Sequence, residues 1–195
     1  MYSQKKYINL LNRIQSENYR FSTNWGEHKD NIILMRHDVD FSVEYALELS
    51  KVEKVEGVTS TFFFMMSSNT YNFLSKKHIE EIIEIREMGH KISLHFDPTC
   101  YRDMESGFEI ERNAFVEMLK VELDIVSIHI PGVFLEDNNR DLCGCAQTYQ
   151  DKFFKKMKYI SDSRGRDIFP PIEEFFKQEL KTPLHLLIHP VWWRY

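Results

Sequence analysis

Short apolar runs alternate with longer amphipathic segments along the chain. A short apolar run between polar stretches is typical of a buried strand, whereas apolar residues that recur every three or four positions predict a helix. By these criteria we expect strands at 32–35, 61–66, 91–94, 125–128, 159–161 and 184–188. Helices are expected at 4–17, 41–53, 75–88, 105–122 and 172–180. Such alternation predicts a mostly parallel sheet that the helices cover on its outside.

The number of strand–helix units limits the fold classes that the chain can adopt. Six or seven units in 195 residues favour a single α/β domain folded as a barrel, complete or incomplete. A flavodoxin-like sheet is the alternative. The domain is expected to begin with a helix within residues 1–20. Residues 131–148 follow neither periodicity and predict a long loop at the barrel mouth, a kind of loop that is often functional.

Composition narrows the class of protein. Lys and Arg number 25 against 30 Asp and Glu, a net charge of −5, which argues against a nucleic-acid partner. No apolar stretch is long enough to span a membrane, and the first residues lack a signal-peptide pattern, so the cytoplasm is the expected compartment. The three cysteines are odd in number, which fits a reducing compartment. Cys143 and Cys145 form a CxC pair that lacks the second half of a metal site.

Carboxylates and imidazoles follow five of the six expected strands. The carboxyl ends of parallel strands meet at one edge of the sheet, where functional groups collect in α/β folds. We therefore expect a site at this edge. The residues concerned are Asp38, Asp40, His95, Asp97, His129, Asp162 and His189.

Asp38 and Asp40 are two residues apart on an extended segment, so their side chains point the same way. Two adjacent carboxylates repel unless a cation or proton lies between them. One economical arrangement is a divalent metal held by one carboxylate, with the other free as a base. The alternative is that Asp40 caps the helix that begins near residue 41.

The histidines divide into candidate ligands and structural residues. His95 is a candidate metal ligand, although a buried histidine bonded to the backbone is the alternative. Asp97 is either a further ligand or a partner that orients His95. His129 is the candidate third ligand. Nitrogen and oxygen ligands suit zinc first, with manganese, cobalt, nickel or iron as other choices. The remaining histidines are expected to be structural at His90 and at surface or loop positions at His28, His78 and His185.

Asp162 and His189 are expected on neighbouring strands, where a carboxylate can keep an imidazole protonated for use as a general acid. Arg164 could position such a carboxylate or bind an anionic substrate group. Trp192 and Trp193 follow His189 directly, and they could stack on a sugar ring or cover the barrel mouth.

Six blocks in this order resemble the polysaccharide deacetylase superfamily, the NodB-homology group. They are RHDVD at 36–40, STFFF at 60–64, GHKISLH at 89–95, HIP at 129–131, YISDSRG at 159–165 and LLIHP at 186–190. Together they span most of the chain. The resemblance implies a distorted, incomplete (β/α) barrel forming one catalytic domain. It also implies metal-dependent hydrolysis of an N-acetyl or similar acyl group on a sugar.

The resemblance also implies roles for individual residues. Asp38 corresponds to the general base, Asp40 and His95 to metal ligands, and His189 to the general acid that Asp162 holds. Apart from the resemblance, we expect Arg164, beside Asp162 in the sequence, to contribute to catalysis. Arg36, Asp97, Pro131, Trp192 and Trp193 are expected to contact the substrate, a sugar or a nucleotide- or lipid-linked precursor.

The sequence departs from the superfamily pattern at three places. A residue separates the two aspartates, Thr99 stands where the second metal histidine is usual, and Ile130 stands where an arginine is usual. His129 or Asp97 must then supply the third ligand. The alternatives are another metal-dependent barrel hydrolase and a glycan-binding relative without turnover.

Overall fold

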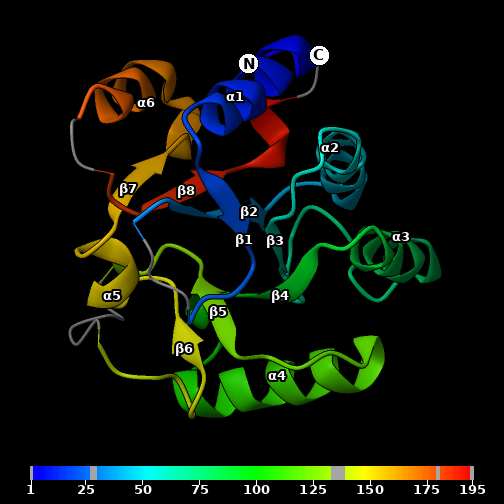
Figure 1. The fold of residues 1–195 in the computed structure, drawn as a ribbon. Helices are drawn as coiled ribbons and strands as arrows, with labels where there is room; N and C mark the ends of the chain where they lie inside the picture. Colours follow the sequence, from blue (N-terminus) through cyan, green and yellow to red (C-terminus); the bar gives the residue numbers. More distant parts are fainter. Residues whose placement is uncertain (1, 27–29, 133–138, 179–180, 194–195) are drawn as a thin grey trace.

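Eight parallel strands form one curved sheet in the computed structural model (Figure 1). The structure describes residues 2–26, 30–132, 139–178 and 181–193. The strands are β1 (Arg20–Ser22), β2 (Ile32–Val39), β3 (Thr61–Phe64), β4 (Lys91–Phe96), β5 (Ile125–Ile128), β6 (Ala146–Gln147), β7 (Lys158–Ser161) and β8 (Leu184–Ile188).

The order of the strands shows that the sheet is an incomplete barrel. It runs β6-β5-β4-β3-β2-β8-β7, and β1 pairs with the beginning of β2. Read around a circle, this is the order of the sequence with one break between β6 and β7, where no ladder joins the described residues. A flavodoxin-like sheet would reverse its strand order at a switch point. That alternative is therefore wrong, and the incomplete (β/α) barrel is confirmed.

Helices surround the outside of the sheet (Figure 1). They are α1 (Gln4–Ser16), α2 (Val43–Val55), α3 (Lys76–Glu87), α4 (Met104–Leu119), α5 (Asp151–Phe154) and α6 (Phe169–Phe176). Four of them begin at a capping side chain that accepts a backbone N–H bond, supplied by Ser3, Ser42, Ser75 and Asp103. Within the described residues, none of these helices is long and apolar enough to cross a membrane.

Several elements differ from the sequence-based expectation. The strand expected at 32–35 continues to Val39, so the RHDV segment belongs to β2 itself. β1, α5 and β6 were not expected, because elements of two to four residues are too short to show a period. β6 interrupts the expected loop at 131–148, of which 133–138 lies outside the described residues. α6 begins three residues early, with prolines at its first positions.

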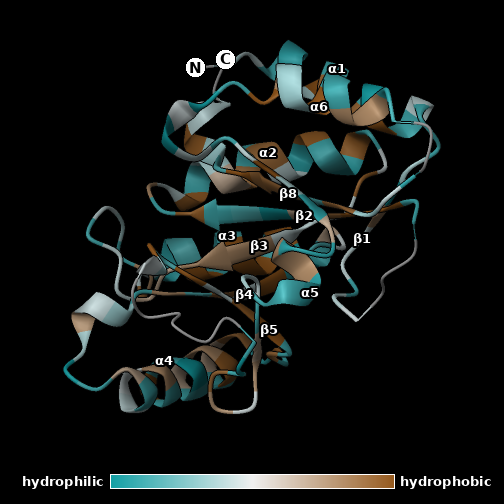
Figure 2. Ribbon diagram, turned by 90° about the vertical axis from the view of Figure 1, so that its left-hand side faces the viewer, coloured by the Kyte–Doolittle hydropathy of each residue, from teal (hydrophilic) through white to brown (hydrophobic). Residues whose placement is uncertain are grey.

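Side chains alternate between the two faces of β2. Ile32 and Leu34 point into the barrel, where they pack with aromatic residues such as Trp25 and Phe63. Ile33 and Met35 point outward, against α1 and its neighbours. The barrel floor is therefore apolar. The C-terminal end of β2, drawn as a teal arrowhead in Figure 2, is polar and lies at the mouth.

His185 is also inside the barrel, and its expected surface position is wrong. Its side chain is fully buried, its Nδ1 lies 3.2 Å from the Phe153 carbonyl oxygen, and its ring packs edge-on against Trp25 and Tyr159. His90 is buried, in line with its expected structural role, and His78 is half-buried. His28 lies outside the described residues.

A buried polar cluster holds the outer face of β2 to two helices. His37 Nε2 donates to Glu53 Oε1 on α2 at 2.7 Å, and the Tyr7 hydroxyl of α1 donates to the same oxygen. Ser60 Oγ donates to Glu53 Oε2 at 2.6 Å, and His37 Nδ1 faces the Ile188 carbonyl at 3.2 Å. Glu53 and His37 are completely buried. Protein groups therefore supply the hydrogen bonds of this buried cluster, as buried polar groups require.

We expect Glu53→Gln to destabilise the fold by about 3 kcal/mol, because it removes the buried carboxylate that accepts hydrogen bonds from His37, Tyr7 and Ser60. Burial opposes the Glu53 carboxylate, but His37, His90 and Ser60 together outweigh burial and lower the pKa of Glu53. A lowered pKa stabilises the folded state above the ordinary glutamate value of about 4.3. That stabilisation is lost as the pH falls through the lower, folded value. Chemical denaturation of the wild type and the variant at neutral and acidic pH measures both effects.

Glu48→Gln on the same helix is the matched control, because Glu48 is exposed. Its expected cost is within about 0.5 kcal/mol. Equal costs for the two variants would contradict the assigned importance of the Glu53 pair.

Candidate active site

Three side chains converge at the barrel mouth as a candidate metal group, which comprises Asp40, His95 and His129. They follow or end β2, β4 and β5, respectively. Asp40 Oδ1 lies 3.1 Å from His95 Nε2 and 3.5 Å from His129 Nδ1. The two ring nitrogens are 3.1 Å apart. Ligands of a tetrahedral zinc ion, at about 2.0–2.1 Å from the metal, are separated by about 3.3 Å.

The hydrogen bonding and ionisation of this group fit a bound cation. Asp40 Oδ1 is buried and, within the described residues, lacks a well-aligned hydrogen bond. Burial would raise the pKa of Asp40, but contacts with His129 and His95 hold this pKa well below its ordinary value. The contact with Asp40 raises the pKa of His129 against the effect of burial. The group thus presents an ionised carboxylate beside two imidazoles, a donor set suited to zinc and similar ions.

His129 joins Asp40 and His95 where Thr99 and Asp97 do not. Thr99 is exposed. Its backbone N–H and its hydroxyl both donate to Asp97 Oδ1, at 2.9 Å and 2.6 Å, respectively. Asp97 therefore caps a short 3₁₀ turn at 98–100. Among the described residues, no hydrogen bond reaches His95 Nδ1, so Asp97 does not orient that ring.

The turn after β5 fixes His129. Its backbone N–H donates to the Phe96 carbonyl at 2.8 Å, which extends the pairing of β5 with β4. The next residue, Ile130, has φ of 43°, a left-handed conformation that β-branched residues rarely adopt. Such strain is retained where surrounding contacts impose it, often at functional sites. Pro131 follows, half-buried.

Asp38 has one occupied and one free carboxylate oxygen. Its Oδ2 accepts from Arg36 Nη2 at 3.0 Å and from Ser127 Oγ at 3.2 Å. Its Oδ1 is buried and has no hydrogen-bond partner within the described residues. His95 Nε2 lies 3.9 Å from Asp38 Oδ2, so Asp38 lies beside the candidate metal group. The arrangement leaves Oδ1 free to accept a proton.

Arg36 lies beneath Asp38 and is completely buried. Its other hydrogen bonds go to the Thr148 hydroxyl and, at 3.0 Å, to the Tyr149 hydroxyl. Burial opposes the charge, but Asp38, Tyr149 and Tyr159 together outweigh burial and raise the pKa of Arg36. These contacts place the guanidinium under the carboxylate. A substrate contact, expected from the sequence, stays a prediction.

Asp162 and His189 meet on neighbouring strands, as expected. β7 pairs with β8, and His189 Nδ1 donates to Asp162 Oδ1 at 2.6 Å. Burial disfavours the imidazolium, but the hydrogen bond and charge of Asp162 outweigh it and raise the pKa of His189. With Nδ1 engaged, Nε2 is the free nitrogen, and it lies 3.8 Å from Asp40 Oδ2.

The remaining expected residues lie around this centre. Trp193 is buried, and its indole N–H donates to Asp162 Oδ2 at 2.8 Å. Trp192 is half-buried near Gly165, and Arg164 is exposed after β7 with φ of 62°. Within the described residues, the Arg164 side chain takes part in no ion pair, so its expected catalytic role stays a prediction.

Sequence reasoning missed three site residues. Ser127 lies on β5 opposite His95, and its inward position follows from strand alternation, so that pattern could have identified it. Thr148 and Tyr149 follow the two-residue strand β6, inside the expected loop. No sequence signal connects them with Arg36.

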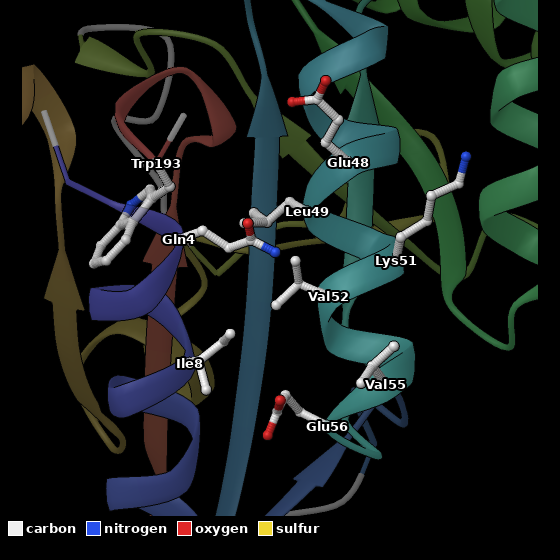
Figure 3. A pocket seen from close by; sticks show the side chains of 9 residues that line it. All are labelled: Gln4, Ile8, Glu48, Leu49, Lys51, Val52, Val55, Glu56 and Trp193. Carbon is white, nitrogen blue, oxygen red and sulfur yellow. The ribbon is translucent and has the colours of Figure 1, made fainter. Parts of the chain in front are cut away.

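A separate groove lies outside the barrel between α1 and α2, with a volume of about 500 Å³ (Figure 3). Its lining combines residues of both helices with Trp193. Trp193 is also the lining residue that contacts Asp162. The groove lacks the converging carboxylates and imidazoles of the barrel mouth, so we place the candidate active site at the mouth.

A second cluster, Glu44, His78 and Glu81, lies between α2 and α3. His78 Nε2 is 3.3 Å from Glu44 Oε1, which also accepts a hydrogen bond from Lys77. The ammonium group of Lys77 already neutralises the charge of Glu44. We assign no metal to this cluster, and it serves below as a control for the first.

No family model matches the sequence, and no curated protein matches it. Solved structures do share its fold. The peptidoglycan deacetylase PdaC from Bacillus subtilis matches with a TM-score of 0.55 and 13% identity, over 84% of this chain and 78% of that one. The chitin deacetylase from the fungal pathogen Colletotrichum lindemuthianum matches with a TM-score of 0.53 and 16% identity, over 82% and 73%.

A third match is BA3943 from Bacillus anthracis, described as a CE4 family pseudoenzyme. Its TM-score is 0.51 and its identity 13%, over 88% of this chain but 57% of the pseudoenzyme, so this chain spans less than two thirds of its length. A mutant of the same protein is described as having restored enzymatic activity. At these identities the similarity concerns the fold. The chain thus adopts the fold of the CE4 polysaccharide deacetylases, as its motifs predict.

Proposed function

We propose that this protein is a metal-dependent hydrolase that removes an N-acetyl or similar acyl group from a sugar. One observation carries the proposal. The free oxygen of Asp38 and the free nitrogen of His189 belong to residues that both adjoin the Asp40–His95–His129 group. A proton acceptor and a proton donor beside one cation site are the parts that amide hydrolysis needs.

Asp40, His95 and His129 would hold the metal, with zinc as the ion that best suits the donor set. A bound divalent ion polarises a carbonyl group and lowers the pKa of water toward ~7. An acidic and a basic group must then move protons on either side of the amide.

Asp38 accepts the first proton at Oδ1 while water attacks the carbonyl carbon. Arg36 and Ser127 hold the other oxygen, so the carboxylate keeps its orientation. His189 then donates a proton from Nε2 to the nitrogen that leaves as the amine. Asp162 supports the protonated imidazole at Nδ1. The carbon–nitrogen bond breaks, and the products are a carboxylic acid and an amino sugar.

The proposed substrate class is supported by the fold neighbours, which are named for peptidoglycan and chitin. We therefore propose an N-acylated sugar as the substrate of this chain, and we expect it to be part of a nucleotide- or lipid-linked precursor. Exposed Arg164 and Arg166 would supply positive charge for an anionic part of such a substrate. An assay panel therefore contains soluble N-acetylated precursors beside the two polymers.

The second candidate is a glycan-binding protein without turnover. Its support is the pseudoenzyme among the fold neighbours, together with Thr99 at the usual position of a metal histidine. The presence of both Asp38 and the His189–Asp162 pair opposes it, because binding alone requires neither a base nor an acid.

We expect His129→Ala to lose the bound metal, because it removes one of three ligands. Elemental analysis after dialysis against a trace mixture of zinc, manganese, cobalt, nickel and iron gives the stoichiometry. The wild type should retain one tight ion per chain. Thr99→Ala should retain it too, because Thr99 is exposed and outside the group.

His78→Ala is the matched control from the second cluster. If it releases the ion while His129→Ala keeps it, the metal has been assigned to the wrong cluster. A wild-type chain without tightly bound metal favours the binding protein.

We expect Asp38→Asn to lower the turnover of an N-acetyl substrate by about 10² to 10⁴, the contribution typical of general acid–base catalysis. The bound metal should remain, because Asp38 is outside the ligand set. Turnover and metal content are measured on the same sample. Full activity in this variant would exclude Asp38 as the base.

A further inference from the structure

Asp162 is completely buried and accepts hydrogen bonds on both oxygens. Oδ1 accepts from His189 Nδ1 at 2.6 Å, and Oδ2 accepts from Trp193 Nε1 at 2.8 Å. The backbone N–H of His189 is shared between the two oxygens at 3.0 and 3.1 Å. The carboxylate is therefore held between the imidazole on one side and the indole on the other.

The indole bond fixes the plane of the carboxylate. An indole N–H is only a donor, so Trp193 can satisfy Oδ2 but cannot compete with His189 for a proton. With Oδ2 held, Oδ1 stays in line with His189 Nδ1, and the ring keeps Nε2 toward Asp40. Removal of the indole N–H leaves Oδ2 with only its share of the backbone N–H, in a site without solvent.

Trp193 is itself held in place. Its ring stacks on Tyr2 with centroids 4.5 Å apart and packs against Tyr7 of α1 at 5.2 Å. Its backbone N–H donates to the Pro190 carbonyl at 3.1 Å, one residue after His189. The Trp193 ring also lines the groove between α1 and α2 (Figure 3). The Trp193 ring is therefore fixed by packing that lies outside the active site.

We propose that Trp193 is a positioning residue for the general acid: through Asp162 it orients His189 for proton donation to the leaving amine. The substrate contact expected of Trp193 from the sequence stays a separate prediction. The inference rests on the proposed function, and Trp193 touches no reacting atom in it.

The test compares Trp193→Phe with Trp25→Phe. Both substitutions keep an aromatic ring and remove one buried indole hydrogen bond. That of Trp25 goes to the Thr61 hydroxyl at 3.0 Å, at the apolar floor of the barrel. Thermal unfolding of both variants shows whether their losses of stability match, so that a difference in activity is not a difference in folding.

Two substrates separate positioning of the acid from a general structural effect. An N-acetyl amide needs protonation of its leaving nitrogen, whereas an acetate ester of an acidic phenol does not. We expect Trp193→Phe to lower kcat on the amide by about 10- to 100-fold, as is usual for the loss of a supporting hydrogen bond. KM for the amide and turnover of the ester should stay close to wild type. Trp25→Phe should leave all three quantities nearly unchanged.

Equal losses on amide and ester, or no loss on either, would overturn the inference. A readout without turnover keeps it testable if the wild type proves inactive. The proton on His189 Nδ1 gives an NMR signal whose position reports its bond to Asp162. That signal should move in Trp193→Phe and not in Trp25→Phe. An unmoved signal in Trp193→Phe overturns the inference. If the signal moves but the wild type has no turnover, the positioning of His189 by Trp193 stands, and the inactivity counts against the proposed function alone.

Discussion

The buried ion pair of Arg36 and Asp38 constrains the rest of the barrel mouth. A guanidinium without solvent must find acceptors inside the protein, or the fold loses several kcal/mol. Arg36 finds one on its own strand and two beyond β6, in Thr148 and Tyr149. The same side chain therefore orients the candidate base and binds the segment that follows β6. Since β6 borders the open seam of the barrel, Arg36 provides there an attachment that a strand ladder would otherwise provide.

β2 links the chemistry of the mouth to the stability of the outer layer. Its inward side chains include Arg36 and Asp38, while His37 between them points out to Glu53. His37 also faces the carbonyl of Ile188, the residue before His189. The strand that carries the candidate base is thus held against α2 by the His37–Glu53 hydrogen bond and in the barrel interior by the Arg36–Asp38 ion pair. These two oppositely directed contacts leave β2 little freedom to rotate or to shift its register.

The sequence predicts the barrel, its main strands and the residues at their ends, because long periodic segments and strand-end chemistry are local signals. The Asp162–His189 pair was expected from two neighbouring strands and lies there. His185 was misplaced, because a polar residue at an inward position of β8 looks like a surface residue until the barrel closes around it. The contacts of Arg36 could not be predicted, because Thr148 and Tyr149 belong to a segment whose path depends on tertiary packing. The indole bond of Trp193 likewise depends on how the chain turns after β8.

The candidate metal ligands come from three different strands, β2, β4 and β5, and the position in the chain that would provide a second ligand near His95 holds Thr99 instead. An ion bound here acts as a cross-link between residues 40, 95 and 129, which are far apart in the sequence. The unfolded chain cannot bring these three side chains together without paying the full entropy of loop closure. Binding of an ion at this candidate group would therefore be thermodynamically linked to folding, and the free ion concentration would set part of the stability of the barrel. A cell that limits the metal would then limit the amount of folded protein as well as its activity.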